Sequence, residues 1–254
     1  MEYLQGEKFR QVADNNKIYY CNTHDVNSFF DNINFTHDFV LVSHNSDGKL
    51  TDTPRNQYDA DVRKAPKNLK KWYAQNVDHE SDLIEPIPIG LENSEWFRET
   101  RKIEKLFKIK ETEKNFKNLV YLNLNITNNP IERGPIYEML KDKSFVTTEY
   151  GRNGLGYDNY LNNLHNHQFM ICPEGNGIDV HQPWESMYIN TIPIQKKSIN
   201  NSNWRELPVC WVNEWSEIED EDFLMSEYER ITTTTFDTSK LDFLYWENKI
   251  KNTL

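Results

Sequence analysis

The sequence has few cysteines and no apolar run long enough to cross a membrane. Cysteine occurs only as Cys21, Cys172 and Cys210, with no Cys-x-x-Cys pair and no close grouping of cysteine with histidine. We therefore expect buried, reduced thiols rather than metal ligands. No apolar run approaches the roughly 20 residues of a membrane-spanning helix, and the first ten residues lack the apolar core of a signal peptide. The sequence predicts a cytoplasmic protein with no membrane span.

Basic residues are also scarce relative to acidic ones. The chain has 29 lysines and arginines against 40 aspartates and glutamates, and its formal net charge is -11. A general nucleic-acid binder, or a protein that binds anionic membranes, needs a basic face. We therefore expect no nucleic-acid partner. Hydrophobic residues make up 37% of the chain and aromatic residues 13%, which indicates a folded protein with a substantial core.

Metal and dinucleotide motifs are weak. Two Asp-x-Asp triplets occur, Asp59–Asp61 and Asp220–Asp222, but neither directly follows an apolar strand and both have charged neighbours. We interpret them as solvated and expect no metal site. A dinucleotide-dependent oxidoreductase would have Gly-x-Gly-x-x-Gly near its first strand. Here Gly175 and Gly177 come late and Val180 occupies the third position, which argues against that class.

The chain alternates short apolar runs with helical patterns. In chain order, the runs interpreted as strands are 17–21, 39–43, 69–76, 83–90, 118–125, 145–149, 169–172, 192–194 and 207–212. The segments interpreted as helices are 95–110, 131–141, 157–165, the segment that contains Trp184, Met187 and Tyr188, 220–231 and 239–251. Pro86 and Pro88 favour an edge position or an extended loop for the fourth run. Strands that alternate with helices predict an α/β fold with parallel sheets and right-handed crossovers.

This pattern predicts two Rossmann-like halves. We place an N-terminal domain at residues 1–112 and a C-terminal domain at residues 113–254, with the charged helix 95–110 as the seam between them. The last helix, 239–251, is expected to pack back across the first half.

The most informative stretch is residues 168–194, which read QFMICPEGNGIDVHQPWESMYINTIPI. A strand stops at Pro173, a loop with two glycines follows, and a helix then leads to a second strand. Polar groups between a strand and a helix N-terminus lie where open α/β folds bind ligands. Gly175 and Gly177 allow backbone N–H groups to approach a nucleotide diphosphate, and the helix N-terminus adds a favourable field. We expect the Glu185 carboxylate to accept hydrogen bonds from both hydroxyls of a ribose.

The segment PEGNGIDVHQPWESMYINTIPI resembles the signature of exostosin-like glycosyltransferases and related short GT-B enzymes, which is P-x-G-x-G-x-D-x-H-R-x-W-E-A followed by small residues and an apolar strand. LVSHNSDG, KKWYAQNV, PIPIGLEN and NITNNPIERGPIY also resemble segments of such proteins, in that order. The likeness covers most of the chain between about residues 38 and 215. It implies a GT-B-like fold, in which two Rossmann-like domains with parallel sheets face a cleft.

The resemblance implies a glycosyltransferase that uses a nucleotide sugar. The donor would be a UDP- or GDP-linked sugar held by the C-terminal domain, with no cofactor and no obligatory metal. The acceptor would be a glycan, a glycoconjugate or another hydroxyl compound held by the N-terminal domain. We expect an inverting reaction. The residues expected to bind the donor are Gly175, Asn176, Gly177, Ile178, Asp179, His181, Glu185, Arg133 and Arg152.

Gln182 departs from the family pattern, because the family usually has arginine directly after the histidine. Arginine is the natural bidentate partner of a phosphate, so its absence weakens the case for a diphosphate. Arg133 and Arg152 lie at or after strand ends of the C-terminal half and are candidates to supply the charge. Gln182 also leaves an alternative open, a non-catalytic protein on the same fold that binds glycans or a partner.

An inverting glycosyltransferase needs a side chain that takes the proton of the acceptor hydroxyl. His44 and Asp47 follow the second predicted strand, in SHNSDG, and we propose Asp47 as the base with His44 in support. Gly48 lets the backbone turn tightly enough to aim the carboxylate inward. His24 and Asp25, which follow the first strand, are the next candidates.

Overall fold

The computed structural model describes residues 2–94, 102–150 and 156–254. Its N-terminal half contains a four-stranded parallel sheet with the order β1-β2-β5-β6. The elements of this half are α1 (Gly6–Gln11), β1 (Ile18–Asn22), α2 (Val26–Asn32), β2 (Phe39–His44), β3 (Leu50–Thr51), β4 (Ala60–Asp61), β5 (Leu69–Ala74) and β6 (Ile84–Pro86). Strands β3 and β4 form a separate parallel pair. Strand β6 lies at the sheet edge, which confirms the position predicted from its prolines.

The C-terminal half contains a five-stranded parallel sheet with the order β11-β10-β9-β7-β8. Its elements are α3 (Lys102–Lys110), β7 (Asn118–Leu124), α4 (Pro130–Leu140), β8 (Val146–Tyr150), α5 (Gly156–His165), β9 (His167–Ile171), α6 (His181–Tyr188), β10 (Ile192–Lys196), β11 (Cys210–Val212), α7 (Glu221–Thr233) and α8 (Phe243–Lys251). The chain adds β8 on one side of β7 and β9 on the other. The strand order therefore reverses at β7, which leaves a crevice at the carboxyl ends of β7 and β9.

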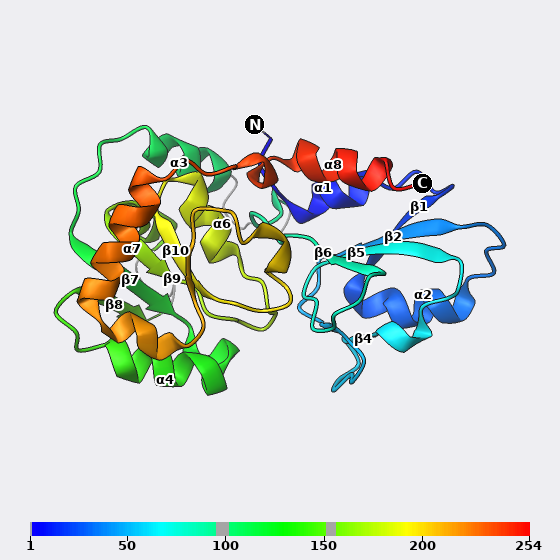
Figure 1. Ribbon diagram of the computed structural model, residues 1–254, viewed down its shortest axis with the longest axis horizontal. Helices are drawn as coiled ribbons and strands as arrows, with labels where there is room; N and C mark the ends of the chain where they lie inside the picture. The colour runs from blue at the N-terminus through cyan, green and yellow to red at the C-terminus, as the bar shows by residue number, and fades with distance from the viewer. Residues whose placement is uncertain (1, 95–101, 151–155) are drawn as a thin grey trace.

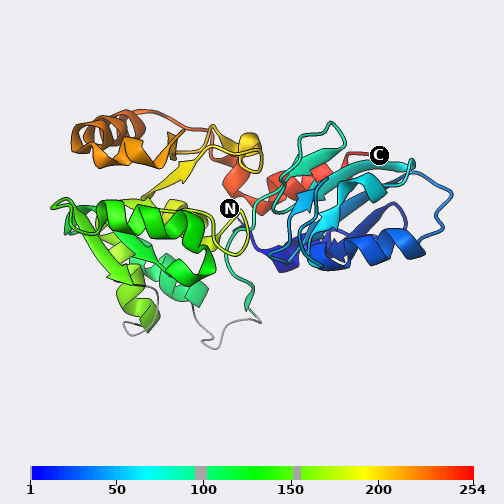
Figure 2. The same cartoon turned by 90° about the horizontal axis from the view of Figure 1, so that it is seen from below.

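Helices cover both faces of both sheets (Figure 1). In the C-terminal half, α4 and α7 pack on one face, while α5 and α6 pack on the other. In the N-terminal half, α2 packs on one face and α1 with α8 on the other. Figure 2 shows the two sheets in separate lobes that lie side by side. The α/β class and the parallel sheets predicted from the sequence are confirmed.

One apolar cluster continues from the N-terminal half into the C-terminal half. In Figure 1, α8 (red) leaves the C-terminal lobe and lies along the N-terminal lobe beside α1 (blue). There the rings of Phe9 and Phe243 pack edge to face, with 5.3 Å between their centroids. The rings of Trp246 and Trp204 also pack edge to face, with 6.5 Å between their centroids. The last helix thus packs across the first half, where the sequence analysis puts it. A domain boundary at residue 112 stays a prediction.

Several short elements are not predicted by the sequence pattern. Helices α1 and α2 have six and seven residues, and β3 and β4 have two each. Elements of this length show too little of a repeating period to be recognised. The helix expected at 95–110 falls partly outside the described residues, and α3 covers its second part.

The cysteines are free and buried, as predicted. Burial raises the pKa of the Cys21 and Cys210 thiols to about 12, so both stay protonated at neutral pH. Within the part of the chain that the structure describes, no helix has the length and apolar character needed to cross a membrane.

Candidate functional site

A pocket of about 380 Å³ opens where the strand order of the C-terminal sheet reverses. Asn123, Asn125 and Asn128 line it from the end of β7 and the following turn, and the loop after β9 lines the opposite side. Asp47 and Ile89 contribute to its wall from the N-terminal half. Open parallel sheets bind their ligands at this place. We call this cavity the switch-point pocket.

The loop 173–180, between β9 and α6, is anchored to the N-terminal half through Asp179. The backbone N–H of Asp179 donates to Oδ1 of Asn76 at 2.8 Å. Its carboxylate accepts a hydrogen bond from the backbone N–H of Ile89 at 2.7 Å. Two donors from its own half, the next backbone N–H and the Trp184 indole, complete its shell at 3.0 Å each. Asp179 therefore joins the loop, α6 and the N-terminal half.

The surroundings of Asp179 are those of a structural carboxyl. Its side chain is 4% exposed. Burial raises the pKa of Asp179 to about 7, although the three N–H donors act in the opposite direction. Both carboxyl oxygens are engaged with the protein, so the contribution of Asp179 to the switch-point pocket, which it lines, is to hold the loop in place.

Arg133 is a buried cation in the lining of the switch-point pocket. It extends from α4, is 5% exposed, and donates to the carbonyls of Glu174 (2.6 Å), Asn125 (3.2 Å) and Pro173 (3.3 Å). Among the described residues, no carboxylate forms an ion pair with its guanidinium. A buried charge without a counter-ion is unfavourable, so the pocket favours a ligand that brings negative charge.

The two glycines of the loop make room for side chains of the protein. A Cβ on Gly175 would lie 2.9 Å from Nη2 of Arg133, and a Cβ on Gly177 would lie 2.6 Å from Nδ2 of Asn76. Both distances are shorter than packed atoms allow. The Gly-x-Gly spacing thus lets Arg133 and Asn76 approach the loop backbone. A direct approach of backbone N–H groups to a diphosphate stays a prediction.

The N-terminus of α6 lies in the same wall. Val180 is its N-cap residue and no side chain caps the helix, while His181 and Gln182 of the first turn line the pocket. The N–H groups of a first helical turn have no partner within the helix and favour anions. The uncapped helix end and Arg133 together make this part of the pocket suited to an anion.

The remaining residues predicted to bind the donor are divided between the pocket and the core. Asn176 is exposed and lines the switch-point pocket, whereas Ile178 is buried and lines a neighbouring cavity. Glu185 is 4% exposed, does not line the switch-point pocket, and accepts a hydrogen bond from the Tyr160 hydroxyl at 2.6 Å. Arg152 lies outside the described residues.

Gln182 has a structural contact of its own. Its buried side chain donates from Nε2 to the carbonyl of Asn123 at 3.0 Å, which ties α6 to β7. The amide has no charge to offer a ligand. In the described lining of the pocket, Arg133 is the one residue with a guanidinium group.

A second pocket, of about 320 Å³, lies on the N-terminal side of the first. It shares Asp47, Ile89 and His181 with the switch-point pocket. Much of its remaining polar lining is neutral and consists of Asn45, Ser46, Gln75 and Asn93. We call it the amide pocket. Asp47 is exposed at the junction of the two cavities.

His44 and His181 differ in the contacts of their ring nitrogens. His44 is fully buried, its Nε2 donates to the Pro88 carbonyl at 3.1 Å, and its Nδ1 accepts from the Asn45 N–H at 2.8 Å. Burial lowers the pKa of His44 to about 4, so the ring is neutral. Both nitrogens are engaged, which disfavours the predicted role of His44 in proton transfer. The half-buried His181 donates from Nδ1 to the Gly90 carbonyl at 2.8 Å, which leaves Nε2 as an acceptor in the neutral ring.

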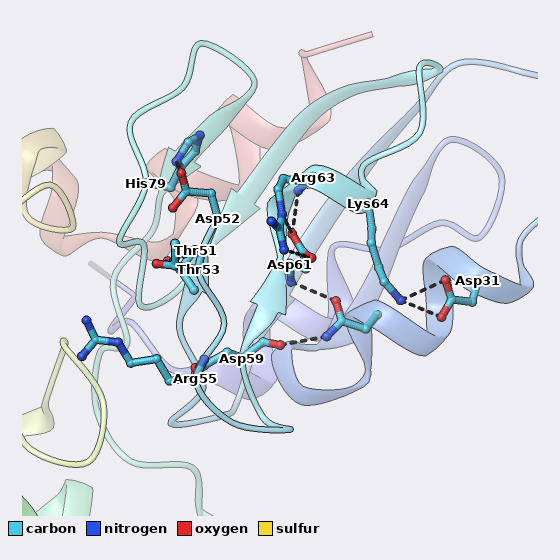
Figure 3. Close-up of polar contacts among 11 residues, drawn as sticks. Asp31, Thr51, Asp52, Thr53, Arg55, Asp59, Asp61, Arg63, Lys64 and His79 are labelled. Atoms are coloured by element: carbon cyan, nitrogen blue, oxygen red, sulfur yellow. Dashed lines mark hydrogen bonds and ion pairs between the residues drawn. The ribbon is translucent and has the colours of Figure 1, made fainter.

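The first Asp-x-Asp triplet differs from the sequence interpretation. Asp59 is 4% exposed rather than solvated. It accepts hydrogen bonds from the backbone N–H of Lys49, just before β3, at 3.0 Å, and from Arg55 and Asn56 in the loop between β3 and β4 at 2.9 and 3.2 Å. Asp61 pairs with Arg63 at 2.7 Å (Figure 3). Asp220 caps α7. Over the described ranges, no group of three or more histidine, cysteine, aspartate and glutamate side chains is suited to hold a metal ion.

The sequence analysis missed the amides that line the two pockets. Asn123 and Asn125 stand at the end of the predicted strand 118–125, while Gln75 stands near the end of 69–76. All three lie at carboxyl ends of parallel strands, where ligands bind. Their position at strand ends could have identified these neutral residues as candidates for ligand binding, because this criterion does not require a charged side chain.

No family model matches the chain, and no curated protein matches it significantly. The resemblance to exostosin-like glycosyltransferases therefore depends on the motif residues themselves.

We expect His44→Gln to have a lower free energy of unfolding than the wild type at neutral pH, and we expect this difference to become smaller in acid. The glutamine amide keeps a donor for the Pro88 carbonyl, and the Asn45 N–H keeps Oε1 of Gln75 as an acceptor at 3.0 Å. The pKa of buried His44, about 4, lies below the unfolded value of about 6.5. The unfolded wild type therefore binds more protons, and its free energy of unfolding falls as the pH drops from about 6.5 to about 4.

The variant has no histidine at this position, so its free energy of unfolding does not fall for this reason. The fall in the wild type is at most about 3 kcal/mol. Urea unfolding of both proteins at about pH 7.5 and about pH 5 measures the difference between their free energies of unfolding. A difference that stays constant between the two conditions would contradict a buried, neutral His44.

Proposed function

We propose that the chain transfers a sugar from a nucleotide-diphosphate donor to a hydroxyl group, with the donor diphosphate in the switch-point pocket. The observation that carries the proposal is the buried Arg133 guanidinium, which has no carboxylate partner in the described structure and lies beside the uncapped N-terminus of α6. A diphosphate brings the negative charge and the acceptor oxygens that both features favour. The resemblance to exostosin-like glycosyltransferases supports a UDP- or GDP-linked sugar.

The order of the two pockets supports a GT-B-like arrangement. In that arrangement the donor is held by the C-terminal domain and the acceptor by the N-terminal domain. The switch-point pocket and the amide pocket follow each other in this order and share Asp47, Ile89 and His181. Side-chain amides both donate and accept hydrogen bonds, so the amide pocket suits a neutral acceptor with several hydroxyl groups, such as a glycan. Residues 1–112 would then form the acceptor domain and residues 113–254 the donor domain.

The reaction requires a leaving diphosphate and a proton acceptor. In an inverting transfer, the acceptor oxygen attacks the anomeric carbon while the bond to the diphosphate breaks. Arg133 and the N-terminus of α6 would stabilise the charge that develops on the diphosphate. The base has to reach the boundary between donor and acceptor. Asp47 and His181 line both pockets there, whereas the ring nitrogens of His44 are both engaged.

Gln182 favours a second candidate function, a non-catalytic protein on the same fold that binds glycans or a partner. Its amide is bonded to the Asn123 carbonyl, so a leaving group would have one cation fewer than the family pattern provides. Release of UDP or GDP from nucleotide sugars above the uncatalysed background separates the two candidates. Turnover supports the enzyme, and ligand binding without turnover supports the alternative.

We expect Arg133→Gln to weaken the binding of UDP or GDP by about 10- to 100-fold, because hydrogen bonds to charged groups contribute roughly 1.5–3 kcal/mol. Isothermal titration calorimetry with both nucleotides measures the affinities. Glutamine can still donate to one of the loop carbonyls, which limits rearrangement of the loop.

Arg205→Gln is a matched control. Arg205 also donates to a backbone carbonyl, that of Ser198 at 2.8 Å, and it is not part of the lining of the switch-point pocket. Its variant should bind the nucleotide as the wild type does. Equal affinities for Arg133→Gln and the wild type, in proteins with the same circular dichroism spectrum, would remove the basis for placing a diphosphate at Arg133.

Glu185 remains the proposed partner of the ribose, and deoxynucleotides test this role. Replacing UDP by 2′-deoxy-UDP should lower the affinity of the wild type by about tenfold, since one hydrogen bond to a charged group is lost. In Glu185→Gln, which keeps an acceptor for the Tyr160 hydroxyl, the same replacement should have a smaller effect. Calorimetry measures all four affinities. If the wild type binds the two nucleotides alike, Glu185 does not hold the 2′-hydroxyl.

We expect turnover that does not require a divalent metal ion. Both aspartates of the first Asp-x-Asp triplet already accept hydrogen bonds from the protein, Asp59 from the loop and Asp61 from Arg63. Rates of nucleotide release with and without EDTA should therefore agree within about twofold. A complete loss of turnover in EDTA that manganese restores would favour a GT-A-like mechanism instead.

A further inference from the structure

The geometry points to His181 as the base: we propose that its Nε2 takes the proton of the acceptor hydroxyl. This inference rests on the proposed glycosyl transfer. It replaces the assignment of that role to Asp47, and it gives His181 a role in proton transfer in place of the expected role in donor binding. Three observations carry it: the fixed ring of His181, its position between the two pockets, and the lack of any group that positions Asp47.

The ring of His181 is oriented by a backbone carbonyl of the opposite half. Its Nδ1 lies 2.8 Å from the carbonyl oxygen of Gly90. A carbonyl only accepts, so Nδ1 carries the proton and Nε2 has the free lone pair in the neutral ring. A base needs this arrangement, in which one nitrogen is anchored and the other can take a proton.

The carbonyl that orients His181 is itself fixed. Gly90 has a φ of 69°, and a Cβ at this position would lie 2.5 Å from the backbone of Leu4. The N–H of Leu91 donates to the Leu4 carbonyl at 2.8 Å. Only glycine fits this close approach, so the turn at Gly90 has little freedom to move. The ring of His181 is therefore positioned relative to the acceptor side by backbone contacts.

His181 lines both the switch-point pocket and the amide pocket. A base that takes the proton of an acceptor oxygen during attack on a donor has to stand at that boundary. The histidine is half-buried, so ligands in either cavity can reach its ring.

Asp47 occupies the same boundary without a fixed position. It is exposed, and no hydrogen bond or ion pair holds its carboxylate among the described residues. An unanchored, solvated carboxylate is a poor proton acceptor at a defined point. Its negative charge still lies in the lining that it shares with His181, where it would stabilise an imidazolium.

The charges around His181 can offset the positive charge that its ring gains during the reaction. The titratable and charged groups in the lining of the two pockets, besides His181, are His44, Asp47, Glu92, Arg133 and Asp179. Once the sugar–diphosphate bond breaks, the negative charge of the leaving diphosphate and of Asp47 offsets the new positive charge.

In the proposed step, one bond to the anomeric carbon forms while another breaks. A lone pair of the acceptor oxygen forms the bond to the anomeric carbon, and the electron pair of the old carbon–oxygen bond leaves with the nucleoside diphosphate. The acceptor proton passes to Nε2 of His181, which becomes an imidazolium and later returns the proton to water.

His181→Asn and His181→Gln test the assignment. The amide nitrogen of asparagine takes the place of Nδ1 and keeps the hydrogen bond to Gly90, while glutamine places an amide near Nε2 that cannot act as a base. Both variants should keep the wild-type affinity for UDP or GDP within about threefold and lower kcat by about 10²- to 10⁴-fold. Rates are measured as nucleotide release from a panel of UDP- and GDP-linked sugars, first with water and then with methyl glycosides as acceptors.

The pH profile gives a readout that a purely structural role would not change. The kcat/KM of the wild type should fall in acid, where Nε2 is protonated, and this limb should be absent from the residual activity of His181→Asn. Asp47→Asn should keep the limb and lower kcat by less than His181→Asn does. His79→Asn is the control, since His79 lies outside both pockets beside Asp52, at 3.7 Å (Figure 3).

Chemical modification tests the free nitrogen without any turnover. Diethyl pyrocarbonate acylates accessible, unprotonated imidazole nitrogens, so peptide mass spectrometry should find His181 modified and the buried His44 unmodified in the folded protein. An unmodified His181 under conditions that modify half-buried His79 would overturn the proposal.

The outcomes separate the base from the proposed function. A wild type that neither binds UDP or GDP nor releases them from any sugar of the panel overturns the proposed function, and the base with it. An active wild type with near-normal kcat in His181→Asn overturns only the base. Loss of the acidic limb in Asp47→Asn instead would return the role to Asp47.

Discussion

The hydrogen bonds of Asp179 across the two halves are the constraint on which the site depends. Its backbone and carboxylate bond to Asn76 and Ile89, so the loop between β9 and α6 is fixed to the N-terminal half as well as to its own sheet. This anchor, together with the hydrogen bond between His181 and Gly90, helps to set the distance between the two walls of the switch-point pocket. The three N–H donors keep a buried carboxyl from being an unsatisfied polar group. Burial of the Asp179 carboxyl is unfavourable by itself, but the hydrogen bonds that offset this cost also fix the position of the loop.

Arg133 uses the fixed loop as its support. Its three hydrogen bonds go to backbone carbonyls, which orient the guanidinium without forming an ion pair with it. The chain as a whole has a formal net charge of -11, so the long-range field repels anions. Affinity for an anion must therefore come from short-range contacts in the pocket, where solvent screens little. The negative net charge thus disfavours partners that need a broad basic surface, whereas a ligand as small as a nucleotide contacts only the local charges of its pocket.

The elements with a clear period or a dense apolar run could be predicted from the sequence, and so could the edge of the C-terminal sheet at which the switch-point pocket lies. Strands such as β2 and β7 are apolar over most of their length, and α6 follows a loop of proline and glycine. The partners of the polar residues could not be predicted, because they come from distant parts of the chain. Asp179 and Asn76 are 103 positions apart, and His181 and Gly90 are 91 apart. A local pattern shows that a residue is polar and follows a strand, but it does not show which group of the other half it meets.

The two histidines at the pockets illustrate this limit. His44 directly follows apolar residues of a strand and His181 opens a helix after a glycine-containing loop, so both stand where ligands bind in parallel sheets. The two histidines differ in the contacts that their rings make. The ring of His44 stacks on that of Phe9, with 5.1 Å between their centroids. Both of its nitrogens form hydrogen bonds within the protein, so neither is available to a ligand. The ring of His181 has one nitrogen in a hydrogen bond, and the residue lines two cavities. Chemistry at such a site is therefore decided by how many polar atoms the fold leaves without a partner, a quantity that residue type and spacing alone do not determine.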